Sequence, residues 1–162
     1  MKAFMNWSGG KDSALSLYKA RQEGIPVASL LTTVNSGTDR ISMHGVRRIL
    51  LKQQALAMGL PLHTLELPEM PGMETYENAV GTVHRQLKGE GYTHGVFGDV
   101  FLMDLKQYRE KLAAKDGLQC HFPLWGMDSR EVIRQYLQCG FKAIAVCVNN
   151  AFLDKRFCGR LL

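Results

Sequence analysis

Short apolar runs alternate with longer amphipathic segments along most of this 162-residue chain. Runs that are apolar at nearly every position are typical of strands covered on both faces, and strands separated by helices favour parallel order with right-handed crossovers. We therefore predict an α/β fold, a Rossmann-like, doubly wound sheet of about five mainly parallel strands with helices on both faces. The predicted strands are 2–7, 26–34, 62–67, 93–97 and 141–148, and the predicted helices are 13–23, 46–58, 74–88, 104–115 and 129–138.

The same pattern predicts several local features. We expect 35–45 to be a polar loop, and Asp104 to be the N-cap of helix 104–115. Cys147 lies in an apolar run, which predicts a buried thiol. In helix 46–58 the side chains expected toward the core are Ile49, Leu50, Leu56 and Ala57.

Composition indicates an ordinary globular chain of one-domain size, with 46% hydrophobic and 22% charged residues. The net charge of +5 suits polyanions from ATP to tRNA but selects none of them. The four cysteines show no C-x-x-C spacing, and the five histidines show no metal-ligand spacing, so zinc is not expected. No apolar stretch approaches the roughly 20 residues of a membrane span, and no signal-peptide pattern is visible, so we expect a cytoplasmic protein.

A glycine-containing loop joins the first predicted strand to the first helix. Its residues are Ser8, Gly9, Gly10, Lys11, Asp12 and Ser13. The glycines let backbone N–H groups turn inward, the following helix presents its unpaired N–H groups, and the hydroxyls and the lysine add further donors. This loop is neither a Walker A loop nor a G-x-G-x-x-G fingerprint. It nevertheless predicts a phosphate cradle.

Asp12 makes a cation part of this prediction. A carboxylate beside a polyphosphate is repelled unless a cation lies between them, and Mg²⁺ is the natural bridge. We therefore expect Asp12 to be a metal ligand.

The string Ser-Gly-Gly-Lys-Asp-Ser resembles the signature of the PP-loop, or N-type, ATP pyrophosphatases. The resemblance implies an adenine nucleotide alpha hydrolase-like fold, ATP and Mg²⁺ as ligands, and cleavage of ATP between the α- and β-phosphates. It also implies that Lys11 and Asp12 are catalytic and that residues 8 to 13 bind the nucleotide.

Further stretches are similar to the diphthine–ammonia ligase branch of that superfamily. They are 42–46, 97–100, 108–110 and 123–126, which contain Ser-Met-His-Gly-Val, Phe-Gly-Asp-Val, Tyr-Arg-Glu and Pro-Leu-Trp-Gly. His44 follows the second predicted strand and is expected to contact the nucleotide or the acceptor, or else to order its loop. Gly98, after the fourth predicted strand, is expected to let the nucleotide approach closely. Asp99 is expected to be catalytic, binding Mg²⁺ or the amine nucleophile, with a helix cap or a salt bridge as the alternative. We expect 1–162 to be a single ATP-binding domain without the Gly-Glu-x-Gly-Glu-type acceptor motif that the branch carries beyond this point.

Other residues of these stretches have open roles. Arg47 or Arg48 can meet phosphate or carry surface charge, and Trp125 can line an acceptor pocket or simply pack. Arg109 and Glu110 are expected to be an ordinary solvated pair on a helix.

The resulting hypothesis is an ATP-dependent ligase. It adenylates a carboxylate or carbonyl, releases pyrophosphate and amidates the product with ammonia. Its expected partners are ATP, ammonia and an acceptor, for which a protein is one candidate; a homodimer is compatible with the fold, and a membrane or nucleic-acid partner is not expected. The alternatives are an RNA-modifying PP-loop enzyme, such as a tRNA thiolase, and a non-catalytic ATP- or AMP-binding module.

Overall fold

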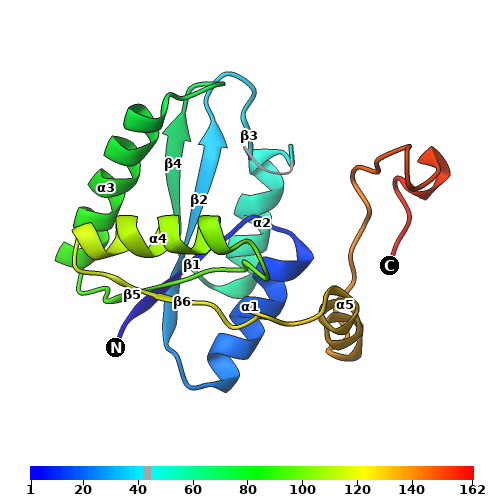
Figure 1. Cartoon of the computed structure of the whole chain (residues 1–162), viewed down its shortest axis with the longest axis horizontal. Coiled ribbons are helices and arrows are strands. Elements are labelled where there is room, and N and C mark those ends of the chain that lie inside the picture. Colours follow the sequence, from blue (N-terminus) through cyan, green and yellow to red (C-terminus); the bar gives the residue numbers. More distant parts are fainter. Residues whose placement is uncertain (42–44) are drawn as a thin grey trace.

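A computed structural model describes residues 1–41 and 45–162, and Figure 1 shows the arrangement of its elements. Helices and strands alternate through most of the chain. In order they are β1 Ala3–Asn6, α1 Lys11–Gln22, β2 Val27–Asn35, β3 Arg40–Ile41, α2 Arg48–Met58, β4 Leu62–Leu67, α3 Met73–Gly89, β5 His94–Val96, α4 Met103–Lys115, β6 Gln119–His121, α5 Ser129–Gln138 and the 3-10 turn Lys155–Phe157.

The described strands form one six-stranded sheet. Its parallel strands lie in the order β4-β2-β1-β5-β6, and β3 adds a short antiparallel pair to the end of β2. The chain first moves outward from β1 through β2 to β4, and then returns to place β5 on the other side of β1. The direction of winding therefore changes between β1 and β5.

Helices cover both faces of the sheet, as the sequence predicts. Alternate side chains of β1 point to opposite faces: Met5 packs with α1 and α2, and Phe4 packs with α3 and α4. On β2, Leu30 and Leu31 divide in the same way. This division explains the nearly continuous apolar runs of the central strands.

A third, smaller apolar cluster attaches α5 to α1. Leu15 of α1 and Val132 and Tyr136 of α5 are buried together with Leu124. Asp128 caps α5, accepting a hydrogen bond from the amide of Arg130 at 2.9 Å. The shape of α5 is therefore determined by its cap and by one buried face.

The predicted strand 141–148 is wrong. Its apolar side chains do not join the sheet, and Ile144 and Val146 are each 60% exposed. Ile144 instead bridges Leu161, in a tail that runs away from the sheet beyond α5 (Figure 1). The fifth parallel strand is β6, which lies outside the predicted strands, and β3 lies within the predicted loop 35–45.

Three local predictions are also wrong. The side chains of Ile49, Leu50 and Leu56 are 53%, 41% and 83% exposed, and Ala57 is exposed too, because α2 turns a different face to the sheet. Cys147 is exposed because the run that carries it lies in the tail. Asp104 lies in the first turn of α4, whose N-cap is Leu102.

No helix within residues 1–41 and 45–162 has the length and apolar character needed to cross a bilayer.

Candidate phosphate-binding site

The change in winding direction brings two predicted motifs to one place. The phosphate loop follows β1, and Gly98 and Asp99 follow β5, its parallel neighbour in the sheet. In open α/β sheets, ligands bind at the carboxyl ends of the strands on either side of such a switch point. The fold therefore puts residues from two distant parts of the chain at the position where a ligand is expected.

The amino end of α1 has no side-chain cap. Its N-cap is Gly10, which has no hydroxyl or carboxylate to accept a bond from the first-turn amides. An uncapped helix start presents N–H groups and the positive end of the helix dipole, which together attract anions. Asp12 is the acidic residue of this first turn.

Two serine hydroxyls hold the loop in a tight turn. The Ser13 hydroxyl donates to the carbonyl of Gly10 at 2.9 Å, and the Ser8 hydroxyl contacts the Ser13 hydroxyl at 3.2 Å. The amide of Gly10 approaches the Ser8 oxygen at 3.4 Å. Because Ser13 is buried and Ser8 is half-buried, these hydroxyls shape the loop in addition to being potential ligands.

Gln54 of α2 supports the same loop, a role that the sequence analysis missed. Its amide oxygen accepts a bond from the indole nitrogen of Trp7 at 2.9 Å, and its amide nitrogen lies 3.4 Å from the carbonyl of Gly9. Gly9 has a φ of +76°, and a Cβ there would lie 2.9 Å from the Gln54 oxygen. The only signal in the sequence is a glutamine on the inner side of an amphipathic helix, which points to no particular partner.

Gly98 packs directly on the phosphate loop. A Cβ at this position would lie 3.1 Å from both the carbonyl carbon of Asp12 and the amide nitrogen of Ser13. Only a residue without a side chain allows the end of β5 to approach the first turn of α1 this closely. The structure thus brings Gly98 together with the loop, and its predicted contact with the nucleotide stays a prediction.

Lys11 and Asp12 pair with each other across this turn. The ammonium nitrogen lies 2.6 Å from a carboxylate oxygen of Asp12, and the two side chains are 37% and 38% exposed. Both groups are accessible enough to exchange this contact for a ligand. The lysine can meet a phosphate, and the aspartate can meet a cation.

The residues present fit a magnesium–nucleotide ligand. The cradle offers an uncapped helix start and one ammonium, and Asp12 offers carboxylate oxygens. Over the two described ranges no cluster of three His, Cys, Asp or Glu side chains could hold a metal by itself. Mg²⁺ is commonly held by one or two carboxylates together with phosphate oxygens and water, which agrees with a single aspartate here.

Asp99 is paired with Arg109 of α4, so Arg109 and Glu110 are not paired with each other. Nε of Arg109 lies 2.6 Å from Oδ2 of Asp99, and Nη2 donates to Oδ1 at 3.5 Å. Glu110 instead pairs with Lys106, one helical turn away. Trp125 is half-buried and meets the ring of Phe122 edge-on at 6.2 Å.

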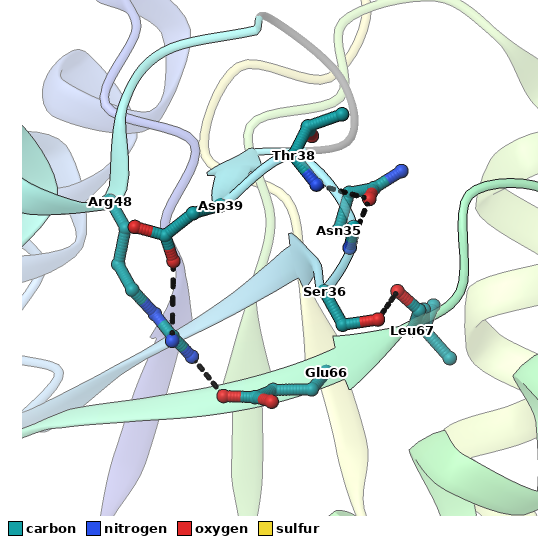
Figure 2. Close-up of polar contacts among 8 residues, drawn as sticks. Asn35, Ser36, Thr38, Asp39, Arg48, Glu66 and Leu67 are labelled. Carbon is teal, nitrogen blue, oxygen red and sulfur yellow. Dashed lines mark hydrogen bonds and ion pairs between the residues drawn. The ribbon is translucent and has the colours of Figure 1, made fainter.

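A separate network of hydrogen bonds and ion pairs holds the loop after β2 (Figure 2). The Asn35 side chain accepts the amide of Thr38 at 3.1 Å, and the Ser36 hydroxyl donates to the carbonyl of Leu67 at 3.1 Å. Arg48 binds Asp39 at 3.3 Å and also pairs with Glu66. The hydrogen bond to Glu66 is the main cause that raises the pKa of Arg48.

Arg47 and Arg48, the two arginines predicted to meet phosphate or carry surface charge, have different surroundings. Arg48 is engaged by two carboxylates, so its guanidinium serves the loop. Arg47 is exposed at the N-cap of α2. His44 lies outside the described residues.

A pocket opens beside these groups, under α3 and α4 and next to the carboxyl ends of the central strands. The polar side chains that line it are Asn6, Thr33, Tyr76, His84, Tyr108 and Arg109. His84 is 4% exposed, and its Nδ1 has no hydrogen-bond partner among the described residues. Burial lowers the pKa of His84, although the charge of Asp116, 3.7 Å away, acts in the opposite direction. The pocket is therefore lined by a buried imidazole and two phenols, and by Asn6 at the end of β1, two residues before the phosphate loop.

Comparisons with known proteins agree with this picture of the fold. A family model described as the diphthamide synthase N-terminal domain matches residues 1–120. Among solved structures, a protein of Methanocaldococcus jannaschii described as a predicted subunit of tRNA methyltransferase matches with a TM-score of 0.54. It is 19% identical, and the match covers 85% of this chain and 76% of that chain. No curated protein matches.

Proposed function

Since the chain belongs to the diphthamide synthase N-terminal domain family, a family of PP-loop-type enzymes, we propose that it is an ATP-dependent, AMP-forming amide ligase. The single observation that carries the proposal is the uncapped start of α1, with Lys11 and Asp12 in its first turn and Gly98 packed against it. That arrangement suits the polyphosphate of ATP. The stretches that resemble the diphthine–ammonia ligase branch, at 42–46, 97–100, 108–110 and 123–126, favour ammonia as the second substrate.

In the proposed binding mode the β- and γ-phosphates lie over residues 9–13. Backbone amides of the first turn of α1 bind their oxygens, and Lys11 moves from Asp12 to the phosphates. Asp12 would then hold Mg²⁺, which when bound neutralises charge on the leaving pyrophosphate. Donors that are already in position act most strongly where charge builds during the reaction.

The proposed chemistry has two steps. A carboxylate oxygen of the acceptor attacks the α-phosphorus, and the bond from that phosphorus to the bridging oxygen of pyrophosphate breaks. Ammonia then attacks the acyl carbon, the bond from that carbon to the AMP oxygen breaks, and the nitrogen loses a proton. The products are an amide, AMP and pyrophosphate.

The Lys11→Ala variant tests the proposal. We expect AMP and pyrophosphate release from MgATP, measured with ammonium chloride and a panel of amino-acid and dicarboxylate acceptors, to fall by about 100-fold or more because the leaving group loses its ammonium partner. Lys52→Ala is the matched control, since Lys52 is exposed on α2. Circular dichroism checks that both variants fold. Unchanged AMP release in Lys11→Ala would remove the mechanism.

RNA modification is the second candidate. A net charge of +5 and a neighbour in fold whose title mentions tRNA methyltransferase favour it, although that neighbour is only 19% identical. A gel shift with bulk tRNA at two salt concentrations separates the candidates, because binding through phosphates weakens steeply as salt rises. Binding at low salt would support RNA as the acceptor. Thermal stabilisation by ATP without turnover would support a nucleotide-binding module instead.

A further inference from the structure

Asp99 and Arg109 form a largely buried ion pair at the end of β5. Their side chains are 13% and 23% exposed, and Nε of Arg109 lies 2.6 Å from Oδ2 of Asp99. Neither of these two atoms has a hydrogen-bond partner among the described residues, so the ion pair itself compensates for their burial. The contact from Nη2 to Oδ1 is longer, at 3.5 Å. Oδ2 is thus committed to Arg109, and Oδ1 keeps more capacity for a ligand.

The guanidinium of Arg109 is itself held in place. Its central carbon lies 4.9 Å from the centre of the Phe97 ring, a cation–π contact. Phe97 is 3% exposed and stacks on Phe122 with ring centres 5.3 Å apart. Phe97 also comes two residues before Asp99 in the chain. The strand end that carries the aspartate therefore also carries the platform for the arginine.

Gly98 connects this pair to the phosphate loop. Gly98 stands between Phe97 and Asp99 and packs against the backbone of Asp12 and Ser13. Asp99 is therefore the residue that directly follows the contact with the first turn of α1. Two constraints then act on the Asp99 carboxylate: the glycine contact sets its backbone, and Arg109 sets its side chain.

We infer that Arg109 is a positioning residue, which holds the Asp99 carboxylate beside the phosphate loop so that it takes the proton released by the attacking ammonia. The inference rests on the proposed function. In the second step the new bond joins nitrogen to the acyl carbon, the bond from that carbon to AMP breaks, and one proton passes from nitrogen to Asp99. A general base must lie within hydrogen-bonding reach of its proton, which makes fixed geometry the contribution of Arg109.

The two half-reactions separate this role from a merely structural one. The burst of pyrophosphate in the first turnover reports acceptor adenylation, and steady-state AMP release at saturating ammonium chloride reports the amidation step. In Arg109→Gln we expect the burst to stay within about twofold and steady-state AMP release to fall by about 100-fold, the cost of a catalytic group misplaced by about 1 Å. Arg109→Lys should recover part of the loss, because a lysine keeps the charge without the planar fork.

A double variant and a matched control complete the design. Asp99→Asn should lose as much steady-state activity as Arg109→Gln, and the double variant should lose no more than Asp99→Asn alone, because Arg109 acts through Asp99. Arg134→Gln, which breaks an exposed arginine–glutamate pair on α5, should match the wild type.

The possible outcomes are distinguishable. Equal loss of burst and steady state in Arg109→Gln, additive losses in the double variant, or unchanged steady-state release would each overturn the positioning role while leaving the ligase activity standing. A wild-type protein that releases no pyrophosphate from MgATP would overturn the proposed function, and this inference with it.

Discussion

Gly98 shows how much a single missing side chain determines at this site. A Cβ there would lie 3.1 Å from two backbone atoms of the phosphate loop, which cannot move aside as a flexible side chain could. We expect Gly98→Ala to lower the free energy of unfolding by about 1–3 kcal/mol. We also expect ATP affinity, measured by isothermal titration calorimetry, to fall by at least about tenfold, because the loop amides are displaced.

Gly89 is the matched control for this substitution. It is the last residue of α3, and a Cβ there would meet nothing within 4 Å. Gly89→Ala should leave ATP affinity unchanged and stabilise the fold slightly, by about 0.4–1 kcal/mol, because alanine has less conformational freedom to lose. If Gly98→Ala bound ATP as tightly as Gly89→Ala does, the close approach would have no role in nucleotide binding.

At the residue scale, the sequence predicts local sites better than it predicts partners. The phosphate loop is recognisable because six adjacent residues carry its chemistry. The support that Gln54 gives to Trp7 and Gly9, and the pairing of Arg109 with Asp99, join residues that are distant along the chain. Which side chains meet in such pairs depends on how the helices lie on the sheet. The residues nearby in the sequence do not predict that placement.

Helix α2 shows the same limit at the scale of an element. Its existence and end are predictable from its composition and from Gly59, which caps it with a φ of +64°. Its inner face is not predictable, because apolar residues lie on more than one side of the helix. Leu51 and Ala55 pack on the sheet, with Met58 partly buried beside them, a spacing of four and three residues that competes with the second apolar set.

Substitutions on α2 test which face packs. We expect Leu51→Ala to lower the free energy of unfolding by about 2–5 kcal/mol, because Leu51 is fully buried. Leu56→Lys should change it by less than about 0.5 kcal/mol, because that side chain is 83% exposed. Urea denaturation measures both. A larger loss for Leu56→Lys than for Leu51→Ala would mean that the helix is rotated from the described orientation.

At the scale of the whole molecule, the parallel sheet and its switch point follow from the alternation of elements, but the assignment of the last strand does not. The runs 93–97 and 141–148 are both predicted to be strands, yet only the first pairs with a neighbour in the sheet. The short β6 takes the edge place beside β5, pairing His94 with Gln119 and Val96 with His121. A strand forms only where it pairs with a neighbouring strand, and an apolar run in the sequence does not show whether such a neighbour exists.

Deletion of the tail tests how independent the sheet is of it. Removal of residues 144–162 should shift the melting temperature by less than about 5 °C, because Ile144, Val146 and Leu161 are exposed and Ile144 bridges Leu161 rather than the sheet. A chain that ends at residue 127 should lose more, because Leu15 and Leu124 would lose their buried contacts with Val132 and Tyr136 of α5. Differential scanning calorimetry compares the two. If the chain without residues 144–162 lost its cooperative transition, the tail would have to bury apolar surface against the rest of the protein and so contribute to its core.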